Sequence, residues 1–152
     1  MYQRRTGTRI VERDDRDLTR ADVDVLWRTR RNRVVSALRN FVALRFIPLP
    51  LEDDGTDGAI EQPFRDVVNV VGSRAGLERS QRVQVYDAAL IALAGLPLGM
   101  DLPSPFGIHD ELDQIVAGSP EISEAVLQVW STVDDREFWT AVAKRLMRSG
   151  SA

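Results

Sequence analysis

A long stretch of apolar residues at three- and four-residue spacing dominates the N-terminal third of the sequence. The stretch begins near Thr19 and ends before Pro48. Its apolar positions are Val23, Leu26, Trp27, Val34, Ala37, Leu38, Phe41 and Val42. This spacing follows the turn of an α-helix and places the apolar side chains on one face. Thr19 is a suitable N-cap, and Asp22 follows near the positive end of the helix. The sequence therefore predicts one helix of about seven turns.

Further helical patterns alternate with segments rich in proline and glycine. Residues 48–62 combine prolines, glycines and acids, and we expect a loop there. Pro63 is expected at the first position of a short helix that ends at Gly72. Ser119, followed by a proline and an acid, predicts another helix start. The remaining helices are expected at about 77–94, 108–118, 120–133 and 136–148. No segment predicts a strand, so the fold class is all-α, with the three tryptophans, Trp27, Trp130 and Trp139, in the core.

The chain has 152 residues, the size of one domain, and its composition divides it into three parts. Residues 1–47 form an arginine-rich N-terminal arm and the long helix, residues 48–62 an acidic loop, and residues 63–152 a small helical-bundle core. The first eighteen residues have no periodicity and predict an extended arm. We expect neighbouring subunits to cover the apolar stripe of the long helix.

Charge is distributed unevenly along the chain. The formal net charge is −3, but residues 1–47 carry twelve arginines against six acids, whereas residues 48–152 carry eight bases against seventeen acids. Nineteen of the twenty bases are arginine, whose planar fork suits phosphate oxygens. Such asymmetry indicates a polyanion-binding end joined to an acidic body. The candidate phosphate contacts are Arg4, Arg5, Arg9, Arg13, Arg16, Arg20, Arg28, Arg30, Arg31, Arg33, Arg39 and Arg45, with Arg74, Arg79 and Arg82 as secondary candidates.

The long helix contains a conflict between its charge and its apolar stripe. On an ideal helix, Arg28 and Arg39 lie at one border of the stripe and Arg33 lies at the other. Arg30 and Arg31 fall within the arc of the stripe itself, where a guanidinium group is costly unless it meets an anion or reaches solvent. Two interpretations resolve the conflict. Either these arginines bind a phosphate backbone, or they pair with aspartates and glutamates of the acidic body.

Several kinds of chemistry lack the residues they need. The sequence has no cysteine and one histidine, which excludes disulfides and thiolate sites. The motifs of nucleotide-binding loops, zinc proteases and serine hydrolases are absent. His109 with Asp113 lacks further metal ligands, and the acids Glu52, Asp53, Asp54 and Asp57 lack the spacing of a calcium loop. We expect no cofactor, no metal ion and no enzymatic activity.

Membrane and secretion signals are missing from the sequence as well. No apolar run approaches the roughly 18 residues that a transmembrane helix needs. The first fifteen residues contain no apolar segment typical of a signal peptide. We expect a soluble protein or a soluble subunit.

One set of positions in the C-terminal half follows a recognisable order: Gln84, Tyr86, Ala89, Leu90, Ala92 and Leu93, and later Ser119, Pro120, Glu121, Ile122, Ala125 and Val126. With these positions, residues 79–133 resemble the core of the major capsid proteins of rod-shaped and filamentous archaeal viruses. In that family a helix containing tyrosine, alanine and leucine precedes a loop, a short helix and a helix that starts with an (N/S)PEI-type motif. The longer charged N-terminus and the EDDGTDG segment depart from the pattern.

The resemblance implies a nucleocapsid protein of a virion. Its subunits, as a homodimer or as a heterodimer with a paralogous capsid subunit, would wrap linear double-stranded DNA in the A-form, without sequence preference, and polymerise into a helical filament, with a possible surrounding envelope. The arginine-rich arm lies where that family places its DNA-wrapping region. Two alternatives remain: a head-to-tail adaptor or completion protein of a tailed phage, and a small all-α DNA-binding regulator.

Overall fold

The computed structural model of the protein describes residues 15–45, 55–96, 99–102, 106 and 110–150, and for residues 41–45, 55–59 and 146–150 it describes the backbone alone. These ranges contain helices and no strand, so the all-α prediction is confirmed for them. The helices are α1 (Arg20–Arg45), α2 (Gly55–Ala75), α3 (Arg79–Gly95), α4 (Asp110–Val116), α5 (Pro120–Val133) and α6 (Arg136–Gly150). Among the residues described, no helix has the length and apolar character to cross a membrane.

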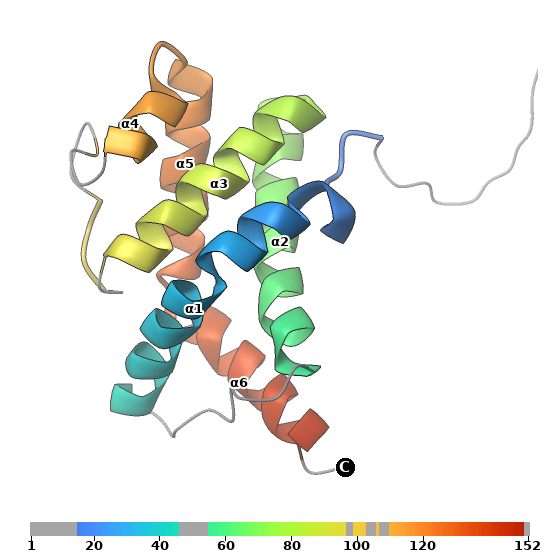
Figure 1. The fold of residues 1–152 in the computed structure, drawn as a ribbon, viewed down its shortest axis with the longest axis vertical. Coiled ribbons are helices and arrows are strands. Elements are labelled where there is room, and N and C mark those ends of the chain that lie inside the picture. The colour runs from blue at the N-terminus through green and yellow to red at the C-terminus, as the bar shows by residue number, and fades with distance from the viewer. Residues whose placement is uncertain (1–14, 46–54, 97–98, 103–105, 107–109, 151–152) are drawn as a thin grey trace, which may run out of the picture.

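The helices form a bundle in which α3 has a central place (Figure 1). α3 packs against α1, α2, α4 and α5, and α2 also packs against α5 and α6. In Figure 1, α1 runs diagonally across the front of the bundle, and its first half crosses α2. α4 lies alongside α3 in the upper part of this view, away from the carboxyl end of α1.

Local sequence signals predict two helix starts correctly. At α1, the backbone N–H of Thr19 donates to Oδ2 of Asp22 over 2.7 Å, and the hydroxyl of Thr19 meets the same oxygen at 3.1 Å. The Asp22 carboxylate therefore satisfies the amide that precedes the first turn. At α5, Oγ of Ser119 accepts from the backbone N–H of Ile122 over 3.3 Å, and Pro120 occupies the first helical position. Both caps depend on residues within three positions, which is why the sequence alone predicts them.

The predicted start of α2 is wrong. α2 begins at Gly55, so Pro63 lies inside the helix and residues 55–62 belong to the helix instead of to an acidic loop. An interior proline has no N–H for the carbonyl four residues earlier, a loss of about 3 kcal/mol in an isolated helix. Here the added turns bring Ile60 and Glu61 into the buried interior, where both side chains are almost fully covered. Tertiary packing therefore outweighs the local preference of the proline for a helix start.

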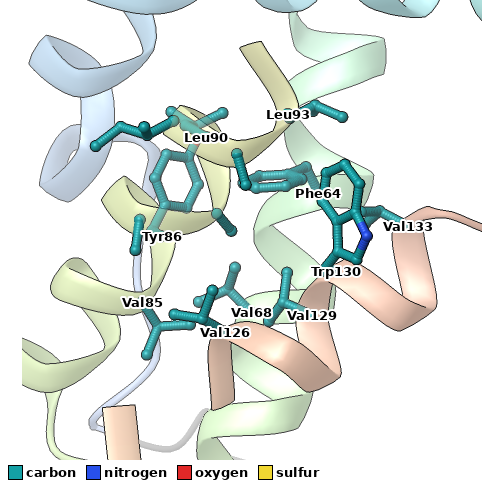
Figure 2. Close-up of a cluster of buried hydrophobic side chains, with 14 of the residues drawn as sticks. Phe64, Val68, Val85, Tyr86, Leu90, Leu93, Val126, Val129, Trp130 and Val133 are labelled. Carbon is teal, nitrogen blue, oxygen red and sulfur yellow. The ribbon is translucent and has the colours of Figure 1, made fainter. Parts of the chain in front are cut away.

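The core lies where α2, α3 and α5 meet (Figure 2). Phe64 of α2 and Tyr86 of α3 stack edge to face, with ring centroids 5.1 Å apart and planes at 78°. Valines of α5 and the ring of Trp130 close the cluster from the other side. The prediction of buried tryptophans is confirmed: Trp27, Trp130 and Trp139 are each at most 4% exposed.

The apolar stripe of α1 is covered by the chain itself. Val23, Trp27, Val34 and Leu38 are at most 1% exposed, and α1 packs most extensively against α3. The expectation that neighbouring subunits cover the stripe is therefore wrong for these four side chains. α1 belongs to the bundle. The expectation of an extended arm over the first eighteen residues is wrong at Asp17 and Leu18, which contact the bundle, and residues 1–14 lie outside the described residues.

A buried arginine ties the entrance of α1 to the rest of the bundle. Arg82 of α3 is fully buried, and its guanidinium donates to the Leu77 carbonyl over 3.0 Å and to Oδ1 of Asp17 over 2.7 Å. Beside it, the Asn69 side chain binds both backbone groups of Leu18, at 2.8 and 3.1 Å. The turn from α2 to α3 and the segment before α1 are thus joined through polar contacts.

Replacement of Gly72 by alanine tests how closely Arg82 is packed. A Cβ at residue 72 would lie 2.6 Å from Nε and 2.8 Å from Cδ of Arg82. Although alanine is intrinsically favoured over glycine in a helix, we expect Gly72→Ala to lower the free energy of unfolding by about 1–3 kcal/mol. Urea denaturation measures this change, with Ser73→Ala at the adjacent exposed position as the control, for which we expect a change within about 0.5 kcal/mol. A more stable Gly72→Ala protein would contradict the packing described here.

Candidate nucleic-acid interface

The outer face of α1 carries arginines and no acid over most of its length. From Val25 to Arg45 the helix contains six arginines and neither aspartate nor glutamate. The exposed side chains in the described part of this segment are Val25, Arg28, Thr29, Asn32, Arg33, Ser36 and Asn40. Arg31 and Arg39 are partly exposed. We call this set of residues, from Val25 to Asn40, the α1 outer face.

Arg28 is an exposed arginine that pairs with an acid of its own helix. Its side chain is 67% exposed, and Nε lies 3.3 Å from Oδ2 of Asp24, one turn earlier. Exposed pairs of this kind contribute only about 0.3–0.5 kcal/mol. The Arg28 guanidinium can therefore exchange this carboxylate for another anion at little cost.

The Arg30 side chain points toward the bundle, and its partners resolve the conflict between its charge and the apolar stripe of α1. Its side chain is 15% exposed, and Nε lies 3.3 Å from Oδ1 of Asp87 on α3. Nη2 of Arg30 also pairs with Glu111 of α4. Burial raises the pKa of Asp87, while the neighbouring Arg30 acts in the opposite direction. For Arg30, the interpretation as a partner of acids in the body fits the structure.

A buried carboxylate that sequence reasoning missed holds α1, α2 and α3 together. Glu61 of α2 is fully buried, and its carboxylate lies 3.1 Å from Nε of Arg65 and 3.6 Å from Nη1 of Arg20. The Tyr86 hydroxyl donates to Oε2 of Glu61 over 2.9 Å. We call Arg20, Glu61, Arg65 and Tyr86 the Glu61 cluster. The i,i+4 spacing of Glu61 and Arg65 was a usable signal, but it has meaning only if residue 61 is helical.

The secondary candidates are divided between structural and exposed positions. Arg82 is removed from the candidate contacts because a fully buried guanidinium that binds Asp17 is closed to a phosphate. Arg79 is about half exposed and donates to the Asp15 carbonyl over 2.6 Å. Arg74 lies at an open groove of about 410 Å³ between α2, α5 and α6, lined also by Val70 and Phe138. Arg79 also lies 3.8 Å from Oδ2 of Asp22 at the start of α1, so of the three it is the one beside that helix and open to solvent.

Several sequence-based candidates lie outside what the structure describes. Arg4, Arg5, Arg9 and Arg13 fall before the described residues, and for Arg45 only the backbone is described. Arg16 is exposed just before α1. His109 and the acids at 52–54 are also outside, and for Asp57 only the backbone is described. Within the described side chains, no group of three or more potential ligands could hold a metal ion.

The Glu61 cluster predicts how the ionisation of Tyr86 and the stability of the fold depend on alkaline pH. Burial, and then the charge of Glu61, raise the pKa of Tyr86 far above its usual value. The Tyr86 hydroxyl therefore stays protonated in the folded protein at a pH near 10, where a tyrosine in the unfolded chain releases its proton. The contribution of Tyr86 to the free energy of unfolding is complete below pH 10 and is lost as the pH rises above it. In a Tyr2→Phe background, which leaves Tyr86 as the one remaining tyrosine, absorbance at 295 nm should rise only together with unfolding.

Circular dichroism over the same alkaline series is the control. Ionisation of Tyr86 near pH 10 in a protein that keeps its full helical signal would contradict the buried hydrogen bond to Glu61. A Tyr2→Phe/Tyr86→Phe protein should show no absorbance change of this kind.

Comparison with known proteins identifies no relative of this chain. No family model, no curated protein and no solved structure matches the chain. Its function is therefore inferred from the geometry and the charges of this chain.

Proposed function

We propose that the protein is a structural DNA-coating protein that binds the phosphate backbone of double-stranded DNA without sequence preference. The observation that carries this proposal is the α1 outer face, which combines exposed arginines with hydroxyl and amide side chains and contains no acid. Arginine, serine, threonine and asparagine are the side chains with which proteins contact phosphate oxygens. The arginines at 4, 5, 9 and 13 precede α1 in the chain and would extend the same contact.

The acidic body supports the proposal because its negative charge would orient the molecule on DNA. Exposed acids are found on α4 and α5, among them Asp110, Glu111, Glu121 and Glu124. Like charges raise the free energy of a wrongly oriented encounter, so DNA would be repelled from these helices and attracted to the α1 outer face. The acidic helices would then be left for contacts between subunits.

The more specific part of the proposal is that the DNA-coating protein is a nucleocapsid subunit of a virion. The resemblance of residues 79–133 to filamentous-virus capsid proteins supports a subunit, homodimeric or paired with a paralogue, that polymerises along DNA into a virion. The described helices that carry the resemblance, α3 and α5, contribute many of the buried side chains of the core (Figure 2). Such a subunit would present α1 to DNA and the rest of the bundle to its neighbours.

One observation favours a second function, a protein adaptor of a phage particle. The groove between α2, α5 and α6 has apolar walls that include Val67, Val70 and Phe138, with Val70 about half exposed. Exposed apolar surface of this kind is common at protein interfaces. An adaptor would form rings and would leave DNA unbound, whereas a DNA-coating protein would form filaments on DNA.

The arginines of the α1 outer face should determine DNA affinity and its dependence on salt. In the triple variant Arg28→Ala/Arg33→Ala/Arg39→Ala, we expect weaker binding to duplexes of unrelated sequence by the same factor. The slope of log affinity against log salt should fall by up to about 0.9 for each lost phosphate contact, or about 2.7 for three. Fluorescence anisotropy over a salt series measures both quantities, and circular dichroism checks that the variant is folded.

A variant of α6 matches the change in net charge. Arg136→Ala/Lys144→Ala/Arg145→Ala removes three exposed bases elsewhere on the surface, and we expect it to leave the salt slope near that of the original protein. If both triple variants weaken binding equally, net charge is the cause and the α1 outer face is not the site. Electron microscopy with linear DNA and nuclease protection along its whole length then distinguish a coating protein from a regulator that protects one site.

A further inference from the structure

The arginines of the α1 outer face lie along its two borders. On a helix that turns about 100° for each residue, Arg28 and Arg39 lie within about 20° of each other, and Arg33 lies about 120–140° away. Between the borders are Val25, Thr29, Asn32, Ser36 and Asn40, which are all exposed and short, and all but Val25 are polar. The face is thus neutral in the middle and positively charged on both sides.

This distribution separates two ways of binding a duplex. A helix that lies along one phosphate backbone needs its positive charge in the middle of the contact face. A helix that lies in a groove has a phosphate backbone on each side and base edges below it. Charged borders and a neutral polar middle match the second arrangement.

The dimensions of the grooves select one form of nucleic acid. An α-helix with its side chains is about 10–12 Å wide, and the major groove of B-form DNA, about 12 Å wide, admits one helix. The minor groove of B-form DNA is about 6 Å wide. The major groove of an A-form duplex is too deep and narrow for side chains to reach its bases.

On the basis of the proposed function, we infer that the α1 outer face lies in the major groove of B-form DNA. Arg28 and Arg39, about 16 Å apart along the helix axis, contact phosphates of one strand, and Arg33 contacts phosphates of the other. The short side chains between them face the base edges. This arrangement differs from the A-form duplex that the capsid-protein resemblance implies.

The chemistry of the middle of the face agrees with binding that tolerates any sequence. Hydroxyl and amide groups both donate and accept hydrogen bonds, so they meet the donors and acceptors of every base pair in the major groove. Longer side chains with a single charge would select one base, as arginine selects guanine. The α1 outer face therefore fits the major groove without discriminating between base pairs.

The position of α1 in the fold leaves this face accessible. α1 lies at the front of the bundle in Figure 1, and the inner side of the helix is occupied by Trp27, Val34 and Leu38. The inward arginine, Arg30, is paired with α3 and α4 and holds the helix on the bundle. The helix therefore approaches DNA as a fixed part of the body.

Groove-modified duplexes test the inference with the protein unchanged. The probes are four 30-bp duplexes of the same sequence: unmodified DNA, DNA with 5-hydroxymethylcytosine, DNA with glucosylated 5-hydroxymethylcytosine, and RNA. Glucose fills the major groove and adds no charge. We expect the glucosylated DNA and the RNA to bind at least about tenfold more weakly than unmodified DNA, a change of about 1.4 kcal/mol, and the hydroxymethylated DNA to bind like unmodified DNA.

The possible outcomes separate this inference from the proposed function. Equal affinity for unmodified DNA and for either the glucosylated DNA or the RNA overturns the major-groove arrangement but leaves phosphate binding in place. Absence of binding to all four duplexes overturns the proposed function and this inference together. Conversion of the DNA to the A-form on binding, seen by circular dichroism, also overturns the inference and favours the arrangement of the filamentous-virus family.

Discussion

The burial of the Glu61 carboxylate is the constraint on which the arrangement of the first three helices depends. A fully buried carboxylate is costly unless it is paired and hydrogen-bonded. Here Arg65 comes from the same helix, Arg20 from α1 and Tyr86 from α3. A shift of α1 along the bundle would separate Arg20 from Glu61 and leave the carboxylate less well compensated. The cluster therefore selects one position for α1, even if its net contribution to stability is small.

The position selected by the Glu61 cluster decides which arginines of α1 face inward. With Arg20 placed on Glu61, the period of the helix turns Arg30 toward Asp87 and Glu111. The same rotation turns Arg28, Arg33 and the short polar side chains between them to solvent. One set of arginines thus holds the helix on the acidic body, and the other set forms its surface. The pairing interpretation therefore holds for the inner side of the helix, at Arg30, and phosphate binding is our proposal for its outer side.

Features that depend on neighbouring residues could be predicted from the sequence, and those that depend on distant residues could not. The cap at Ser119 and the helical character of α1 follow from local chemistry and periodicity. The start of α2 was mispredicted because prolines, glycines and acids usually indicate a loop, whereas burial of Ile60 and Glu61 makes the helix longer. The cover of the α1 stripe was also mispredicted, since a periodic apolar face does not reveal which segment of the chain packs on it.

The same limit applies to the candidate interface. Charge counting identified the arginine-rich segment, but it treated Arg82 and Arg28 alike. One of them is fully buried and the other is 67% exposed. Asp17 lies 65 positions from Arg82, so no sequence motif connects the two residues. Asp24 and Arg28 form an ordinary i,i+4 pair, whose spacing does not reveal that Arg28 is exposed. Three-dimensional structure is therefore needed to separate arginines that hold the fold from arginines that form a surface.

A net charge of −3 is compatible with DNA binding because charges act locally in salt water. At an ionic strength of about 0.15 M the screening length is about 8 Å, which is less than the 10–12 Å width of a helix. Acids on α4 and α5 are therefore largely screened from an anion that contacts the far side of α1. Asp24, the nearest acid on α1 itself, is already paired with Arg20 at 3.5 Å and with Arg28 at 3.3 Å. A phosphate that reaches the α1 outer face consequently meets a positive surface, whatever the sum over the whole chain.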